Sequence, residues 1–214
     1  MFQHVPNVLT GARLVLACVF FAILSAYQYQ GRGDPTLMIS AFIVYVAAAA
    51  TDFLDGYLAR KWKVEGAFGR VVDPFADKIL VLGSFIFFAG KNFIIPAAEH
   101  PHNVVKTITG VAPGIVVILL ARELLVTTLR GLSESEGQSF GAVWAGKFKM
   151  GFQSGAILII LAYVTFLPYL GRLQPYAEII RDVVIWATVL ITLYSAIAYI
   201  QKAVVLYRGE RASG

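Results

Sequence analysis

Six long apolar runs, separated by short polar or glycine- and proline-containing segments, dominate the pattern along the chain. They are approximately Val8–Tyr27, Thr36–Leu58, Pro74–Ile95, Pro113–Arg130, Lys149–Leu170 and Ile179–Val205. Each approaches or exceeds the length of about 20 residues with which a helix crosses a bilayer. Strands are not expected, because a membrane barrel shows short alternating segments. The pattern predicts an all-α integral membrane bundle of six transmembrane helices in a single domain, residues 1–214.

The composition agrees with a membrane protein. Hydrophobic residues make up 58% of the chain and charged residues 14%, against roughly 25% charged residues in soluble domains. The single cysteine, Cys18, excludes an internal disulfide and a multi-cysteine metal site. The net charge of +5 comes without a basic block typical of nucleic-acid binding. We therefore expect anionic lipids or phosphate-bearing substrates as partners, and no nucleic acid.

Lysine and arginine are distributed unevenly between the two expected sides of the membrane. One side carries most of them, including Arg60, Lys61, Lys63, Lys147, Lys149, Lys202, Arg208 and Arg211, whereas the other carries Arg32, Lys91, Lys106 and Arg172. Cytoplasmic loops are the ones enriched in these residues. The distribution predicts a multi-pass protein of the cell membrane with both termini, and the connection after the second run, in the cytoplasm.

Four aspartates gather around that connection in a chain otherwise poor in acids. Asp52 and Asp55 share a helix face near the end of the second run. Gly69, Asp73 and Asp77, spaced by four, share a face of the third helix if that helix starts near the loop, and Pro74 fits such a start. Carboxylates brought this close repel one another unless a cation lies among them. Oxygen donors of this kind suit Mg²⁺, Mn²⁺ or Ca²⁺. The sequence predicts a site for one or two divalent ions at the cytoplasmic face.

The residues beside the aspartates suggest the chemistry. Gly56 and Ala59 leave room for a nucleotide or diphosphate, and Arg60 can meet a phosphate oxygen. Arg60 can also be a cytoplasmic anchor, as can Lys61 and Lys63. Two divalent ions about 4 Å apart stabilise both the attacking and the leaving oxygen of a displacement at phosphorus. These residues therefore indicate phosphoryl-group transfer at a membrane surface.

The segment also matches a known signature, D-x2-D-G-x2-A-R-x8-G-x3-D-x3-D. Every fixed position is present, as Asp52, Asp55, Gly56, Ala59, Arg60, Gly69, Asp73 and Asp77, a coincidence expected by chance on the order of 10⁻⁹ per starting position. The chain thus resembles the CDP-alcohol phosphotransferases. The resemblance implies that Asp52, Asp55 and Asp73 bind the divalent metal, Mg²⁺ or Mn²⁺, in a site for two ions. It implies that Asp77 is the base and also lies near the metal.

The same resemblance implies that Asp52, Gly56, Ala59, Arg60 and Gly69 border the cytidine diphosphate. Within the family, the bacterial subgroup that makes phosphatidylglycerophosphate is most similar, with CDP-diacylglycerol as donor and glycerol 3-phosphate as acceptor. The similarity includes Asn7, Thr10 and Arg13, Lys78, Ala121-Arg122-Glu123 with Arg130, and Gly146-Lys147-Phe148-Lys149. We expect the acceptor phosphate to bind some of Arg13, Lys78, Arg122, Arg130, Lys147 and Lys149. The 133–139 segment is smaller and more polar than the subgroup leads us to expect.

Other interpretations stay open. The acceptor can be inositol phosphate or serine, and the acids can form the permeation site of a divalent-cation transporter. Arg122 and Glu123 can be an intramembrane ion pair without a catalytic part. Asn7, Thr10 and Arg13, which recur every three residues, can lie at the interface or in a polar cavity. Gly151-x3-Gly155 allows close helix contact within the bundle or in a homodimer. Arg181 and Asp182 are expected to be solvated, and the histidines receive no role.

Overall fold

The structure, a computed structural model, describes the backbone of residues 5–29, 33–62, 67–95, 106–135 and 144–211. It describes the side chains of residues 10–29, 33–51, 75–95, 106–135 and 148–205. Six α-helices and two short 3₁₀ helices make up the described chain. They are α1 (Val5–Ala26), α2 (Pro35–Trp62), α3 (Ala67–Phe88), η1 (Lys91–Phe93), α4 (Pro113–Ser135), α5 (Trp144–Leu170), η3 (Gly171–Leu173) and α6 (Gln174–Arg211).

The expected all-α class is confirmed, and each apolar run coincides with one helix. The described residues form no strand beyond the isolated bridge between Ile94 and Thr107. The third helix begins near the loop as expected, at Ala67, and thus extends beyond the apolar run that starts at Pro74. Likewise, α4 continues past Arg130 to Ser135. A hydropathy window detects only the apolar part of a helix, so polar turns at its ends escape it.

The start of α2 shows how local sequence sets a helix boundary. Pro35 is the first helical residue, where its missing N–H leaves no hydrogen bond unmade. Asp34 precedes it, and its Oδ1 accepts a hydrogen bond of 2.8 Å from the Thr36 backbone N–H. Hydrogen bonds from the side chain and the backbone of Thr36 lower the pKa of Asp34. This cap fixes where α2 begins, at the end of the bundle opposite its aspartates.

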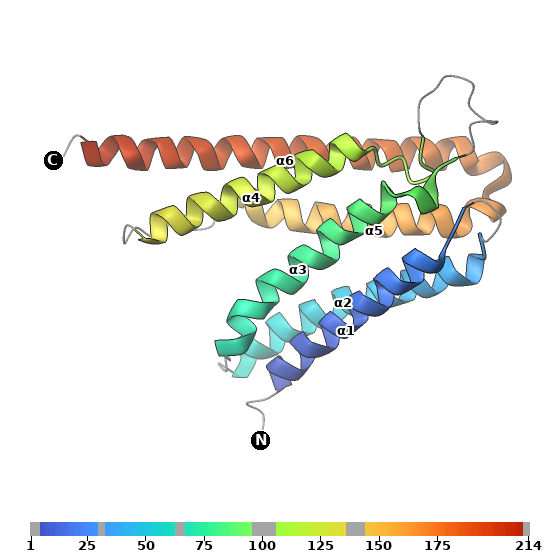
Figure 1. Cartoon of the computed structure of the whole chain (residues 1–214), viewed down its shortest axis with the longest axis horizontal. Helices are drawn as coiled ribbons and strands as arrows, with labels where there is room; N and C mark the ends of the chain where they lie inside the picture. The colour runs from blue at the N-terminus through green and yellow to red at the C-terminus, as the bar shows by residue number, and fades with distance from the viewer. Residues whose placement is uncertain (1–4, 30–32, 63–66, 96–105, 136–143, 212–214) are drawn as a thin grey trace.

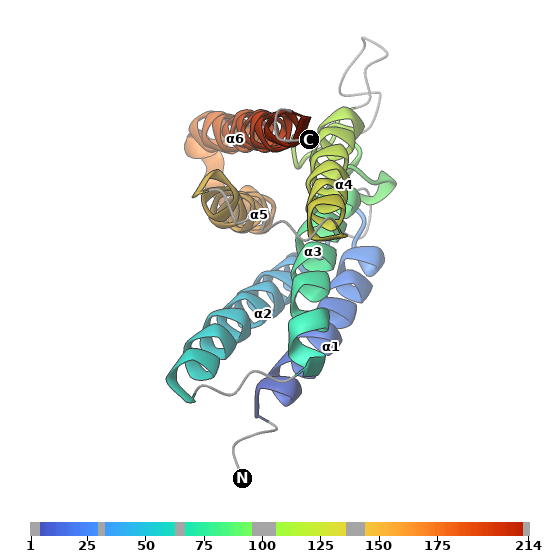
Figure 2. The same cartoon turned by 90° about the vertical axis from the view of Figure 1, so that its left-hand side faces the viewer.

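The helices form two groups in contact. In Figures 1 and 2, α1, α2 and α3 lie on one side and α4, α5 and α6 on the other. The main contacts within and between the groups are α1 with α2 and α3, α2 with α5, and α6 with α4 and α5. The C-terminal ends of α2, α4 and α6 and the N-terminal ends of α1, α3 and α5 point to the left in Figure 1. The predicted site residues of different helices are thereby brought to one end.

Aromatic side chains fill much of the core between α1, α2 and α3. Phe20, Tyr45 and Phe85 are fully or almost fully buried, and the Phe20 and Tyr45 rings lie 5.4 Å apart. Gly83 of α3 permits close approach to α1, because a Cβ atom there would overlap the Phe21 ring. The core thus fixes α1 against α3.

The outer surface of α6 is strongly apolar, as expected for a protein in lipid. Val183, Leu190 and Val205 are each more than three-fifths exposed. Among the described residues, the helical stretch Phe148–Val205 is long and apolar enough to cross a membrane, whereas Thr10–Ala26 and Pro35–Thr51 are shorter apolar helices. The six-span topology and the cytoplasmic placement of the termini stay predictions.

Arg181, expected to be solvated, is instead buried where α6 meets the 106–112 segment. Its Nη1 donates a hydrogen bond of 2.7 Å to the Ile108 carbonyl, and its guanidinium lies 4.6 Å from the centre of the Tyr163 ring. The Asp182 carboxylate pairs with it and is half exposed. The expectation is wrong for Arg181 because the loop before α4 folds over it and supplies a carbonyl acceptor.

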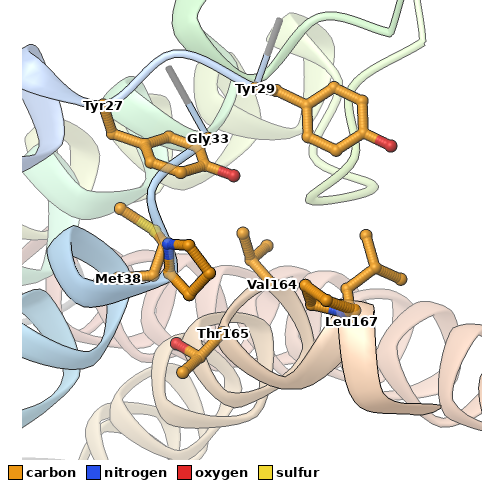
Figure 3. Close-up of a pocket in the computed structure, with 9 residues that line it drawn as sticks. Tyr27, Tyr29, Gly33, Met38, Val164, Thr165 and Leu167 are labelled. Atoms are coloured by element: carbon orange, nitrogen blue, oxygen red, sulfur yellow. The ribbon is translucent and has the colours of Figure 1, made fainter. Parts of the chain in front are cut away.

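A cavity of about 80 Å³ lies near the start of α2 and the end of α5. Figure 3 shows Tyr27, Met38 and Thr165 around it. These residues belong to the end of the bundle that faces away from the connection between α2 and α3 (Figure 1). The cavity is therefore separate from the predicted site.

Candidate active site

The two predicted pairs of aspartates lie on consecutive helices. Asp52 and Asp55, with Gly56, Ala59 and Arg60, belong to the last part of α2, and Gly69, Asp73 and Asp77 belong to α3. Only residues 63–66 separate the two helices, so both pairs lie near the same end of the bundle (Figure 2). The side chains of residues 52–74 lie outside the described residues, and so does that of Lys147. Among the signature residues, Asp77 is the one whose contacts are described.

Asp77 lies against the buried Arg13 of α1. Nη1 of Arg13 donates a hydrogen bond of 3.1 Å to Oδ1 of Asp77. The Arg13 side chain is 1% exposed and that of Asp77 is 20% exposed. Thr10, one turn earlier on α1, is also fully buried, so both α1 residues face the interior rather than the interface. Asp77 therefore combines a fixed position with access to solvent.

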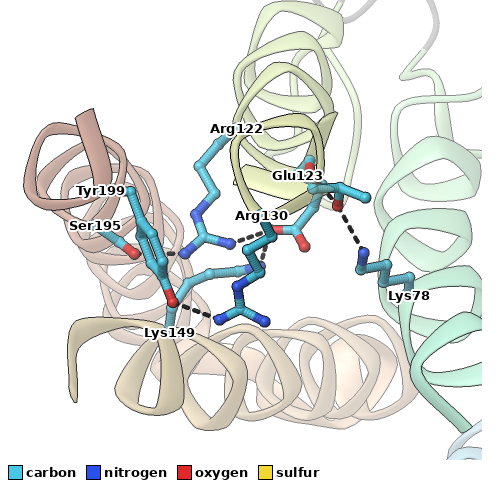
Figure 4. Close-up of polar contacts among 8 residues, drawn as sticks. Lys78, Arg122, Glu123, Arg130, Lys149, Ser195 and Tyr199 are labelled. Atoms are coloured by element: carbon cyan, nitrogen blue, oxygen red, sulfur yellow. Dashed lines mark hydrogen bonds and ion pairs between the residues drawn. The ribbon is translucent and has the colours of Figure 1, made fainter. Parts of the chain in front are cut away.

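Lys78, the next residue, joins α3 to α4. Its Nζ donates a hydrogen bond of 2.8 Å to Oγ1 of Thr127, and that hydroxyl donates to the backbone carbonyl of Glu123 at 2.7 Å. Figure 4 shows Lys78 reaching toward α4. This contact connects the neighbourhood of Asp77 to a polar cluster between α4, α5 and α6.

Glu123 is the acidic centre of that cluster. Its Oε1 accepts a hydrogen bond of 2.7 Å from Nη1 of Arg122 and another from Nζ of Lys149 on α5. All three side chains are buried. Arg122 and Glu123 thus form an ion pair, and Lys149 extends it to a triad. Such a triad links α4 firmly to α5.

Two residues of α6, Ser195 and Tyr199, complete the cluster, and sequence reasoning missed both. Ser195 Oγ accepts a hydrogen bond of 2.5 Å from Nη2 of Arg122, and the Tyr199 hydroxyl accepts one of 2.6 Å from Nη2 of Arg130. The available signal was a polar stripe on an apolar helix. It consists of Thr188, Thr192, Ser195 and Tyr199, all buried and spaced by three or four residues along one face.

Four of the six cations expected to bind phosphate therefore meet in one place. These four, Lys78, Arg122, Arg130 and Lys149, lie near Glu123 (Figure 4). Arg122 and Lys149 pair with its carboxylate, whereas Lys78 bonds to Thr127 and Arg130 to Tyr199. Among the described side chains, the buried cations Arg122 and Lys149 share one carboxylate, that of Glu123, and an excess of buried positive charge is unfavourable unless an anion compensates it. We define Lys78, Arg122, Glu123, Arg130 and Lys149 as the cationic cluster. Arg13 does not belong to it, because its described ion pair is with Asp77.

Comparison with known proteins identifies the family of the chain. A family model described as CDP-alcohol phosphatidyltransferase matches residues 3–194, a range that ends just before Ser195. A Haemophilus influenzae protein named CDP-diacylglycerol–glycerol-3-phosphate 3-phosphatidyltransferase is 30% identical over 94% of this chain and 93% of its own. The Bacillus subtilis protein of the same name is also 30% identical, over 93% of this chain and 94% of its own. The chain therefore belongs to the CDP-alcohol phosphatidyltransferase family and is a transferase.

Proposed function

We propose that this chain is a multi-pass membrane enzyme that transfers the phosphatidyl group of CDP-diacylglycerol to glycerol 3-phosphate. The products are phosphatidylglycerophosphate and CMP. The names of the relatives support this donor and this acceptor, and the apolar helices support a place in the membrane. The donor would enter from the lipid with its acyl chains, whereas the soluble acceptor would arrive from the cytoplasm.

Asp77 is the proposed base. It accepts the proton of the acceptor hydroxyl, the acceptor oxygen forms a bond to the phosphorus that carries diacylglycerol, and the bond from this phosphorus to CMP breaks. The partial exposure of Asp77 allows a substrate hydroxyl to reach it. Its contact with Arg13 supports a change from the initial expectation, because Arg13 then positions the base instead of binding the acceptor phosphate.

The donor set fits a pair of hard divalent ions. Asp52, Asp55, Asp73 and Asp77 offer only carboxylate oxygens, the ligands that Mg²⁺ and Mn²⁺ prefer. When bound, such ions would neutralise charge that develops on the phosphate oxygens. The small residues Gly56, Ala59 and Gly69 would leave room for the cytidine diphosphate, with Asp52 and Arg60 beside it.

The observation that carries the choice of acceptor is the cationic cluster beside Asp77. Lys78 is the neighbour of the base in sequence and reaches α4, so a ligand on the cluster would lie close to the base. A phosphate there would compensate the excess positive charge and accept hydrogen bonds from guanidinium groups. Lys147, two residues before Lys149 on α5, is proposed to add positive charge near the same phosphate.

This cluster also ranks the alternatives. Inositol phosphate shares the phosphate that the cluster would bind, whereas serine lacks it. Membership in a transferase family replaces the transporter interpretation. For the homodimer, no described atom lies within 4 Å of a Cβ atom built at Gly151 or Gly155. Close helix contact there is therefore not made within the described bundle, and we retain the homodimer as a proposal.

The test offers the purified protein several acceptors at once. CDP-diacylglycerol in mixed micelles is mixed with equal concentrations of glycerol 3-phosphate, inositol phosphate and serine, and the lipid products are identified by mass spectrometry. We expect phosphatidylglycerophosphate as the main product. Phosphatidylserine as the main product would contradict the role of the cationic cluster, and phosphatidylinositol phosphate would keep that role and replace the acceptor.

A further inference from the structure

Tyr199 lies on the buried face of α6, whose opposite face is exposed and apolar. It is fully buried, its hydroxyl accepts a hydrogen bond from Arg130, and its ring lies beside two guanidinium groups. The Cζ atoms of Arg122 and Arg130 are each 5.4 Å from the ring centre, within the range of cation–π attraction. Figure 4 shows the ring of Tyr199 beside both arginines.

Ser195 supplies a second contact from the same face of α6. It precedes Tyr199 by one helical turn, is fully buried, and accepts a hydrogen bond from Arg122. Arg122 and Arg130 are themselves about two turns apart on α4. One face of α6 therefore fixes two guanidinium groups of α4.

The chemistry of these contacts differs from that of an ion pair. A carboxylate partner neutralises an arginine, as Glu123 does within the triad. A hydroxyl or an aromatic ring, the described partners of Arg130, orients the planar guanidinium without neutralising it. Arg122 also shares the Glu123 carboxylate with Lys149, so these two cations together keep one positive charge. Arginine has many rotamers, and fixing them before an anion arrives reduces the entropy lost on binding.

We infer that Tyr199 and Ser195 are positioning residues that hold Arg130 and Arg122 in place for the phosphate of the acceptor substrate. They act through the arginines and have no direct part in the chemistry. The inference rests on the proposed function, in that it requires a phosphorylated acceptor.

The test compares Tyr199→Phe and Ser195→Ala with the wild type in micelles. Tyr199→Phe removes the hydroxyl and keeps the ring, and Tyr194→Phe on the same helix, where Tyr194 is 68% exposed, is the matched control. Loss of a hydrogen bond to a charged group predicts a rise of about tenfold in KM for glycerol 3-phosphate. The KM for CDP-diacylglycerol should change less than about twofold, because the lost hydrogen bond serves the acceptor. The kcat should also change less than about twofold, because the acceptor phosphate is bound equally in the ground state and in the transition state.

Inorganic phosphate provides a second readout. As a competitor of the acceptor, it should inhibit Tyr199→Phe with an inhibition constant raised by the same factor as KM. A double-mutant cycle then asks whether Tyr199 acts through Arg130. In an Arg130→Gln background, Tyr199→Phe should raise KM little further.

Several results would overturn the inference. One is an unchanged KM for the acceptor in both variants. A second is a parallel loss of kcat and of affinity for both substrates, together with a lower unfolding temperature. A third is an additive effect of the two substitutions in the double-mutant cycle. If the wild type uses inositol phosphate instead, glycerol 3-phosphate is wrong as the acceptor, and the same variants test the inference with inositol phosphate. If the wild type accepts only alcohols without phosphate, both fail.

Discussion

Arg13 on α1 donates a hydrogen bond of 3.1 Å to Asp77 on α3, and this contact ties the proposed base to a buried cation. The two helices pack closely, because Gly83 lets the Phe21 ring approach α3, and the Phe21 ring stacks on Phe87 with centres 5.2 Å apart. The first helix thus contributes a contact to the proposed site. It holds the carboxylate while one side of it stays open.

Replacing Arg13 tests this role. In Arg13→Met, we expect kcat to fall at least about tenfold, because a base displaced by even 1 Å loses much of its effect. The KM for CDP-diacylglycerol should stay within about twofold of the wild type. Steady-state kinetics in micelles measures both, with Arg172→Met, an exposed arginine of η3, as control. A wild-type kcat in Arg13→Met would show that Asp77 needs no such support.

The proposed roles of the aspartates can be separated by binding measurements. Asp77→Asn should abolish turnover and leave the affinity for CDP largely intact, because it removes the proton acceptor. Asp55→Asn should weaken the binding of both Mn²⁺ and CDP, because it removes a metal ligand. Titration calorimetry gives each affinity. Unchanged Mn²⁺ affinity in Asp55→Asn would count against the assignment.

Glu123 should matter for stability. Glu123→Gln leaves Arg122 and Lys149 buried without their shared negative charge, and breaking a buried ion pair costs about 3 to 5 kcal/mol. We expect a clear decrease in the unfolding temperature in micelles, followed by circular dichroism. Glu134→Gln, at an exposed position of the same helix, is the control. Equal unfolding temperatures for the two variants would mean that the triad adds no net stability.

Gly110 should be intolerant of a side chain. Its φ of 74° disfavours other residues, and a Cβ atom would lie 2.8 Å from Nε of the buried Arg181. We expect Gly110→Ala to lower the free energy of unfolding by about 2 to 4 kcal/mol. Gly171→Ala, with φ of 45° and no described atom within 4 Å, should cost about 1 kcal/mol. Equal losses in chemical unfolding would show that Arg181 yields easily.

The sequence predicted the helices well and the contacts only in part. Long apolar runs determine where helices form, whereas the rotation of each helix about its axis depends on packing. A shared phosphate-binding function could be predicted from the positive charge of Lys78, Arg122, Arg130 and Lys149. The sequence did not show, however, that Arg13 contacts a different partner. Arg13 pairs with Asp77 because α1 packs on α3. Ser195 and Tyr199 were missed because a hydroxyl group on an apolar helix indicates no function until its hydrogen-bond partner is known.

The most direct test of the proposed reaction measures both products in one experiment. Purified protein in mixed micelles receives CDP-diacylglycerol and labelled glycerol 3-phosphate, with and without Mg²⁺ or Mn²⁺, and Asp77→Asn is assayed beside it. We expect CMP release and transfer of the label into lipid, both dependent on the divalent ion and both absent in the variant. Label that stays in the aqueous phase under every condition, or equal turnover by Asp77→Asn, would contradict the proposal.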